Sequence, residues 1–215
     1  GGRVSRVETD ALVRALAAGM RDGRSLTLPQ VRASEPDHYL TAHALNVSVL
    51  SMGLAEVLGC EWRMVHEIGV AGLLYDIGMA RVPAAVRHKP EALTPDEWAL
   101  VQQHPIDGAR ALLDGDGDFD LATLAAYEHH RLHDGSGYPE PRIARPCAPV
   151  TRIVRVCDAY DALCSARPYR AAWTPTQALA MVRAGAGTSF DPDVVRAFDG
   201  LLERAAPVVS AAASA

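Results

Sequence analysis

Apolar residues recur along most of the chain at the spacing of an α-helix, and the strict alternation typical of a half-buried strand is absent. Val13, Leu16, Ala17 and Met20 form one stripe at positions i, i+3, i+4 and i+7, which predicts an N-terminal helix ending near Gly23. The same pattern predicts helices over residues 38–58, 62–76, 106–113, 121–130 and 150–164. We therefore expect an all-α fold.

Three short motifs predict where further helices begin. The segments "TPDE" at 94–97 and "TPTQ" at 174–177 are capping boxes with proline at the first helical position. The first of them predicts a helix that runs to about residue 103. In "DPDVV" at 191–195, Asp191 is the expected N-cap of the last helix.

Glycine and proline mark the expected helix ends. Gly59 should end the helix over 38–58, and Gly78 together with Pro83 should end the helix over 62–76. His104-Pro105 is expected to break the helix before it, because proline lacks the N–H that a helix interior requires.

The acidic segment "DGDGDFD" at 114–120 has the spacing of a calcium-binding loop over its first residues. An EF-hand loop needs glycine at its sixth position and glutamate at its twelfth. Those places hold Phe119 and Ala125 here, so the segment is predicted to be a solvated turn.

Bulk composition limits the classes of protein that fit. The chain has 215 residues, of which 49% are hydrophobic and 22% charged, which suits one compact domain. A net charge of -5 provides no basic field for DNA, RNA or an anionic membrane. No apolar run is judged long enough to span a bilayer, no signal peptide is visible and the four cysteines lack a CxxC pair. These features predict a cytoplasmic protein with reduced thiols.

Several histidines and aspartates lie in or beside apolar helical stretches. They are His43, Asp76, His104, His129, His130 and Asp158. Imidazole and carboxylate groups suit iron, manganese or zinc. A single histidine on a helix is more often a surface or hydrogen-bonded core residue, and His38, His66, His88 and His133 are interpreted in that way.

Two observations favour a metal site among the first group. The adjacent imidazoles of His129 and His130 would tolerate each other well around a shared cation. Asp158 interrupts an apolar face, and an unpaired buried carboxylate is costly. Spacing alone leaves both interpretations open, because the six positions are scattered along the chain.

Two loops carry groups that suit a nucleotide. The glycines of "DGSGYP" at 134–139 allow close approach of a ligand, and the Tyr138 ring could stack on a base. In "SARPYR" at 165–170, Arg167 and Arg170 offer planar donors for phosphate or guanine edges. A structural turn and a solvated loop are the respective alternatives.

Taken together, these segments resemble the HD-GYP family, a branch of the HD superfamily of metal-dependent phosphohydrolases. The resemblance runs from about residue 37 to 199 and includes "GLLYDIG", "LTPDEWALVQQHP", "HHRLHDGSGYP" and "RIVRVCDAYDALCSARPYR" in this order. It implies a helical bundle with a GYP loop, a di- or trinuclear metal centre that often holds iron, and hydrolysis of cyclic di-GMP.

The resemblance also assigns roles to the residues of the expected domain over 37–205. It implies metal ligation by His43, Asp76, His104, His129, His130 and Asp158, with the catalytic Asp76 bridging two ions. Tyr138, Arg167 and Arg170 would hold the dinucleotide, and Asp161 would lie near the reacting phosphate. Residues 1–36 would form a linker to a preceding region or an extension of the bundle, and 206–215 a frayed tail.

The chain departs from the family pattern at the chemistry. Tyr75 replaces the name-giving histidine, Met79 replaces the lysine of "DIGK", and Arg131 replaces an acidic residue. Tyr39 stands where some members carry the glutamate that binds a third ion. A phenol has a reference pKa near ~10, so Tyr75 must lose a proton before it becomes a strong ligand.

These departures predict a degenerate HD-GYP domain that binds metal, recognises cyclic di-GMP and has weak or absent phosphodiesterase activity, as a signalling sensor or adaptor. The alternatives are an active phosphodiesterase that releases pGpG or GMP, and a structural protein-interaction module. The expected cofactor is one or two divalent transition-metal ions, with iron or manganese ahead of zinc. Expected partners are cyclic di-GMP and signalling domains such as GGDEF proteins, and a homodimer is compatible with this interpretation.

Overall fold

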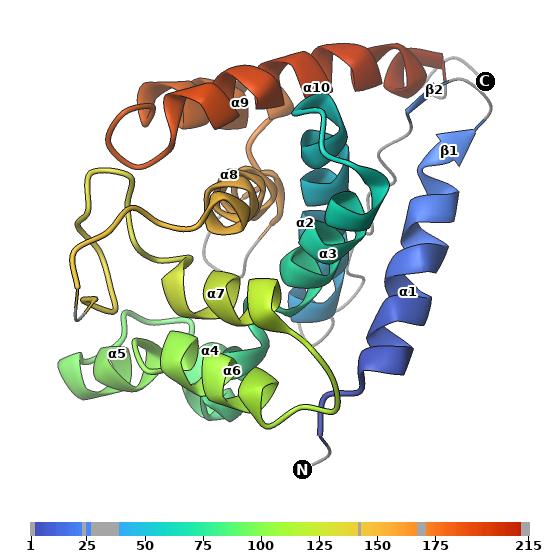
Figure 1. Ribbon diagram of the computed structural model, residues 1–215. Helices are drawn as coiled ribbons and strands as arrows, with labels where there is room; N and C mark the ends of the chain where they lie inside the picture. Colours follow the sequence, from blue (N-terminus) through green and yellow to red (C-terminus); the bar gives the residue numbers. More distant parts are fainter. Residues whose placement is uncertain (1–2, 23–24, 27–38, 142, 167–170, 212–215) are drawn as a thin grey trace.

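The computed structural model describes residues 3–22, 25–26, 39–141, 143–166 and 171–211, and this part of the chain is predominantly helical (Figure 1). The elements are α1 (Arg6–Gly19), β1 (Arg21–Asp22), β2 (Ser25–Leu26), α2 (Tyr39–Val57), α3 (Trp62–Leu74), the 3-10 helix η2 (Ile77–Arg81), α4 (Ala84–Arg87), α5 (Pro95–Val101), α6 (His104–Leu113), α7 (Asp120–Glu128), α8 (Pro149–Cys164), α9 (Pro175–Ala184) and α10 (Pro192–Ala211). The two short strands pair antiparallel. The all-α prediction is confirmed.

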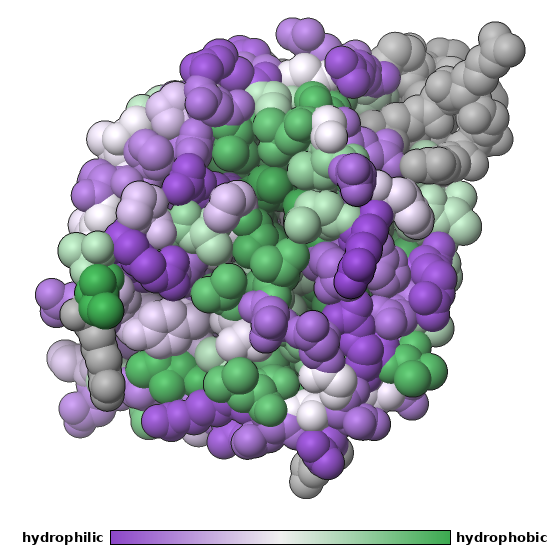
Figure 2. Space-filling model, in the orientation of Figure 1, coloured by the Kyte–Doolittle hydropathy of each residue, from purple (hydrophilic) through white to green (hydrophobic). Residues whose placement is uncertain are grey.

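The helices surround one apolar core. Figure 1 shows α2 and α3 at the centre, α1 alongside them, α9 and α10 across one end and α4 to α6 at the other. Val13, Met52, Val154 and Phe198, from α1, α2, α8 and α10, are fully buried. On the face drawn in Figure 2, apolar surface gathers in the centre and is flanked by hydrophilic surface. The core therefore draws on elements from both ends of the sequence.

The predicted start signals act as expected. Thr94 and Glu97 form a reciprocal capping box at α5, and Thr174 and Gln177 form another at α9. The Asp191 carboxylate accepts a hydrogen bond from the backbone N–H of residue 193 at 2.9 Å, at the start of α10. These side chains satisfy backbone donors that have no partner within the helix.

The turn after α2 also follows the prediction. Gly59 has φ +77, a left-handed conformation that glycine adopts without a Cβ clash. The N–H of Cys60 then donates to the carbonyl of Ala55 at 3.0 Å, as in a helix end closed by glycine.

Two helix boundaries differ from the prediction. The chain after Asp76 was predicted only to end the helix over 62–76. In the structure it forms two further short helices, η2 and α4, before α5 begins. His104-Pro105 begins α6 instead of only interrupting a helix. Proline is tolerated there, since the first turn has no acceptor for the missing N–H.

The acidic segment 114–119 contacts the N-terminal segment as well as solvent. The N–H of Asp116 donates to the carbonyl of Val4 at 2.9 Å, and Arg3 Nε donates to the carbonyl of Asp114 at 2.8 Å. In α1, Asp10 lies 3.0 Å from His66 Nε2 on α3. Of the two alternatives for residues 1–36, this packing favours an extension of the bundle for α1.

By length and composition alone, helix α2 could cross a membrane, although the sequence analysis found no apolar run long enough to do so. In the structure 67% of its apolar window is buried inside the protein, as in a core helix.

At the other end of the chain, α10 continues to Ala211, into the segment predicted to be a frayed tail. Residues 212–215 of that tail lie outside the described residues.

Gly78 allows η2 to pack closely on α6, and this contact generates a stability prediction. A Cβ at this position would overlap the His104 carbonyl oxygen and lie 2.7 Å from the Gly108 backbone nitrogen. Because backbone cannot move aside cheaply, we expect Gly78→Ala to lower the free energy of unfolding by about 1–3 kcal/mol. Urea titration of the purified variant measures this change.

Gly200 provides the matched control, since a Cβ there has nothing within 4 Å and the residue lies inside α10. We expect Gly200→Ala to raise the free energy of unfolding by about 0.5–1 kcal/mol. Equal effects of the two substitutions would contradict the close packing of η2 on α6.

Candidate metal centre

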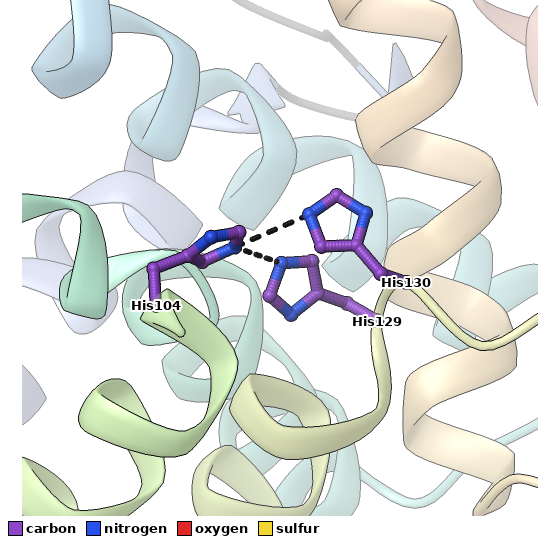
Figure 3. Close-up of side chains that lie close together, drawn as sticks. All are labelled: His104, His129 and His130. Atoms are coloured by element: carbon purple, nitrogen blue, oxygen red, sulfur yellow. Dashed lines mark hydrogen bonds between the residues drawn. The ribbon is translucent and has the colours of Figure 1, made fainter. Parts of the chain in front are cut away.

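Three imidazoles converge where the start of α6 meets the end of α7 (Figure 3). His104 Nε2 lies 3.0 Å from His129 Nε2 and 3.2 Å from His130 Nε2. One ring nitrogen from each residue falls within 4.8 Å of the others. The adjacent histidines reach one side of the group because α7 ends at Glu128 and the chain turns there.

Backbone carbonyls fix the orientation of two of these rings. His104 Nδ1 donates to the carbonyl of Val101 at 2.6 Å, and His129 Nδ1 donates to that of Ala126 at 2.9 Å. A carbonyl only accepts, so the proton of each neutral ring is on Nδ1 and the Nε2 lone pairs face each other. Such outer hydrogen bonds are typical of metal-binding histidines.

The three rings are also kept neutral. Burial lowers the pKa of His104 and that of His129, the latter with a contribution from its histidine neighbours. Burial likewise lowers the pKa of His130 to about 4. Neutral lone pairs 3.0 Å apart repel each other, and a cation between them removes the repulsion.

Asp76 adds a carboxylate to this group. It precedes η2, and its Oδ1 lies 3.3 Å from His104 Nε2 and 4.0 Å from His129 Nε2. One carboxylate and three imidazoles match the number and kind of ligands that a transition-metal ion prefers. The four residues therefore fit one ion.

The other half of the expected centre is arranged differently. The Tyr75 hydroxyl lies 2.9 Å from His43 Nε2 and donates to Asp158 Oδ1, also at 2.9 Å. His43 Nε2 and Asp158 Oδ1 are themselves 2.9 Å apart. We call these three side chains the tyrosine triad. Its phenol faces the two ligand atoms that would be needed for a second ion.

The protonation states of the tyrosine triad oppose ion binding. Burial, together with the charges of Asp158 and Asp76, raises the pKa of Tyr75 well above its ordinary value, so the phenol stays protonated. Burial opposes a charge on His43, but hydrogen bonds to Asp158 and Asp161 outweigh it and raise the pKa of His43 to about 9. An imidazolium has no lone pair for a metal, so an ion in this half would have to displace the proton of His43 as well as the phenol.

Asp161 lies in a different place from the one that the resemblance implies. Its Oδ2 accepts a hydrogen bond from His43 Nδ1 at 2.6 Å, and the residue is 2% exposed. It is therefore behind His43 rather than at the surface where a phosphate would react. The cause is its position on α8, one turn after Asp158 and facing α2.

A cavity of about 400 Å³ opens over the four-residue metal group and the tyrosine triad. Tyr138 stacks on His130 with ring centres 4.6 Å apart, and the Trp98 ring meets Tyr138 edge-on at 6.2 Å. An aromatic wall of this kind suits a nucleobase. Arg167 and Arg170, the other residues expected to hold a nucleotide, lie outside the described residues.

Sequence reasoning missed several residues of this cavity. Trp98, Arg87 and His88 line it, although His88 had been interpreted as an ordinary surface or core histidine. Arg87 lines the same cavity as Met79 and brings a cation to it. The signal that could have found Trp98 in the sequence was its position in the capped helix that leads to His104.

A sequence model of the family described as HD domain matches residues 27–194. The chain is 36% identical over 198 residues to the cyclic di-GMP phosphodiesterase PA4108 of Pseudomonas aeruginosa, covering 92% of this chain and 48% of that protein. It is 41% identical over 150 residues to the cyclic di-GMP phosphodiesterase response regulator RpfG of Xanthomonas campestris, covering 69% of this chain and 39% of that protein. A third relative, the 3'3'-cGAMP-specific phosphodiesterase 2 of Vibrio cholerae, is 33% identical over 156 residues, covering 72% of this chain and 30% of that protein.

A solved structure, Bd1817, a HDG"Y"P protein from Bdellovibrio bacteriovorus, shares the fold with a TM-score of 0.69 at 20% identity, covering 91% of this chain and 62% of that one. The chain spans less than half the length of the three relatives. The family match extends over most of the chain and includes every residue of the metal group and the tyrosine triad. The chain therefore belongs to the HD domain family, in its HD-GYP branch.

Proposed function

We propose that the protein is a degenerate HD-GYP domain that binds one transition-metal ion and a cyclic dinucleotide and hydrolyses it weakly or not at all. The observation that carries this proposal is the tyrosine triad, in which the phenol engages His43 and Asp158 at 2.9 Å each. These two residues are the ligands that a second ion would need. A signalling role as sensor or adaptor follows from binding without efficient turnover.

The metal group supports the first part of the proposal. Asp76, His104, His129 and His130 would hold the ion, with iron or manganese ahead of zinc. When bound, such an ion supplies a Lewis acid that polarises a phosphoryl oxygen. The chain's own contribution is to keep three imidazoles neutral and largely removed from water, and to orient two of them by hydrogen bonds to backbone carbonyls.

Weak turnover is expected from the remaining groups. Hydrolysis with two ions stabilises both the attacking and the leaving oxygen of the phosphate. Here Tyr75 is a neutral, buried phenol and Met79 offers no charge at the cavity wall. Each missing electrostatic contact of this kind reduces the rate by roughly 10²–10³-fold in other enzymes.

The aromatic wall supports binding of the nucleotide. Tyr138 and Trp98 both line the cavity, and their rings meet edge-on at 6.2 Å. Cyclic di-GMP is the ligand we propose first, because relatives at 36% and 41% identity are cyclic di-GMP phosphodiesterases. GGDEF proteins as partners, a homodimer and a cytoplasmic location are further parts of the proposal.

An active phosphodiesterase is the second candidate. It is favoured by the open cavity over a complete four-residue set for one ion, beside a cation supplied by Arg87. In that case one ion and Arg87 together would suffice for hydrolysis. The Tyr75 substitutions described below separate the two candidates.

The metal group generates the first functional prediction. Protein purified without oxygen and supplied with iron and manganese is expected to hold about one ion per chain, as measured by mass spectrometry of the metals. His129→Ala should abolish the bound metal because it removes a ligand from the metal group. His43→Ala, which removes an imidazole from the tyrosine triad, should leave the metal content near the wild-type value. Metal-free wild type, or equal loss in both variants, would contradict the assignment.

The tyrosine triad generates the second prediction. Tyr75→His combined with Met79→Lys restores an imidazole and a cation, and should raise hydrolysis of cyclic di-GMP by at least roughly 10²-fold over wild type. Product formation is followed by chromatography. Tyr75→Phe with Met79→Lys is the matched control, because it removes the hydroxyl without adding a ligand, and it should remain inactive. Wild-type turnover equal to that of the restored variant would show that tyrosine is tolerated.

The aromatic wall generates the third prediction. Tyr138→Ala removes a stacking surface worth about 1–3 kcal/mol and should weaken binding of cyclic di-GMP by roughly 10-fold or more in calorimetry. Arg167→Ala is expected to weaken it as well, through loss of a charged donor. Trp62→Ala, which changes a half-exposed ring outside the cavity, should have no effect. An absence of binding to metal-loaded wild type would favour the interaction module instead.

A further inference from the structure

A second cavity, of about 560 Å³, is lined in part by residues that directly follow His129 and His130 in the chain. It is bounded by residues 131–135, Pro141 and residues 144–147, by the first turns of α8 and by the segment 189–191. Four arginines line it, namely Arg131, Arg145, Arg152 and Arg155. In a protein with a net charge of -5, this concentration of cations in one cavity requires an explanation.

The carboxylates near this cavity do not balance the four guanidinium groups. Glu128, fully buried, pairs with Arg145 at 2.5 Å and with Arg131 at 3.5 Å. Asp191 pairs with Arg152 at 3.0 Å. Two direct carboxylate partners therefore serve three arginines.

Asp134 is the other acidic residue of the wall, and its Oδ1 accepts hydrogen bonds from a nearby residue of the same loop. This oxygen accepts from the N–H and the hydroxyl of Ser136, at 2.9 and 2.7 Å. Arg155 makes its hydrogen bonds to neutral groups, since it donates to the carbonyl of Ser189 at 3.0 Å and to that of His129. Among the described residues, Arg155 has no carboxylate within ion-pair distance, although the charges of Asp158 and Asp134 act on it from further away. The four guanidinium groups therefore face three nearby carboxylates, those of Glu128, Asp134 and Asp191.

Arg131 is the most deeply buried guanidinium group of the wall, and one of its donors is unpaired among the described residues. The residue is 3% exposed and lines the cavity, and its Nε has no acceptor within the described part of the chain. A buried N–H without an acceptor is destabilising by about 1–3 kcal/mol. This Nε atom is itself inaccessible to solvent, so an oxyanion in the cavity would offset the positive charge of the guanidinium groups rather than accept from this donor.

We propose that this cavity is a second ligand site, which binds the phosphate group of a small molecule the size of a mononucleotide. Planar guanidinium groups match phosphate geometry, and the negative charge of a phosphate opposes the net positive charge of the wall. The volume lies within the range of small-molecule sites, and Pro141, Pro146 and Phe190 give an apolar wall for the rest of the ligand. Arg155, bonded to the carbonyl of His129, links this site to the metal group.

The site is tested by calorimetry on metal-loaded protein with inorganic phosphate, AMP and GMP as probes and adenosine as the phosphate-free control. Wild type is expected to bind AMP and GMP, and not adenosine. Binding of inorganic phosphate alone as tightly as the nucleotides would limit the site to a free phosphate ion. Equal binding of adenosine and AMP would overturn the proposal, as would no binding of any phosphate-bearing probe.

Variants distinguish this site from the metal group. Arg145→Gln, at the partly exposed rim, and Arg155→Gln should each weaken AMP binding by about 10-fold or more, as expected for a lost charged hydrogen bond. Arg183→Gln, an exposed arginine paired with Asp199 outside the cavity, should leave the affinity unchanged. His129→Ala should lose metal and still bind AMP, whereas loss of AMP binding in that variant would place the phosphate at the metal group and overturn the proposal. If Arg155→Gln fails to fold, the result with Arg145→Gln decides.

Discussion

The hydrogen bonds that join Tyr75 to His43 and Asp158 link three helices at the centre of the molecule, and the chemistry of the cavity depends on them. His43 comes from α2 and Asp158 from α8, while Tyr75 follows the last residue of α3. A buried phenol, imidazole and carboxylate are each costly without a partner, and here each satisfies the others. The helices can therefore pack closely around polar groups without an ion between them.

This arrangement divides one cavity into two electrostatically different halves. On the side of the tyrosine triad, Asp158 and Asp161 hold His43 with a pKa of about 9, so positive charge is already present as an imidazolium. On the other side, His104 and His129 are neutral and direct lone pairs toward each other 3.0 Å apart. In the half that contains the tyrosine triad, protons on Tyr75 and His43 satisfy the polar groups. In the half that contains the metal group, a cation is needed between the imidazoles. The phenol of Tyr75 thus lies on the protonated side of a cavity whose other side presents three neutral imidazoles.

Sequence reasoning was strongest where a short local pattern determines the structure. Capping by Thr94 and Glu97 and the left-handed turn at Gly59 depend on neighbouring residues and were predicted correctly. The resemblance anticipated that His104, His129 and His130 would meet, although their spacing alone could not. The place of Asp161 behind His43 was not foreseen, because it depends on how α8 faces α2, 118 residues away. The ion pairs of Arg145 with Glu128 and of Arg152 with Asp191 were missed for the same reason, since only the fold determines which carboxylate each arginine meets.

The central claim is that the phenol of Tyr75 takes the place of one metal ion. Anomalous diffraction from crystals of iron-loaded wild-type protein tests it most directly, because the signal locates each ion independently of its ligands. We predict one peak, surrounded by Asp76, His104, His129 and His130, with the Tyr75 hydroxyl still hydrogen-bonded to Asp158. Two peaks, with the second bound by His43 and Asp158 or by the Tyr75 oxygen, would contradict the account.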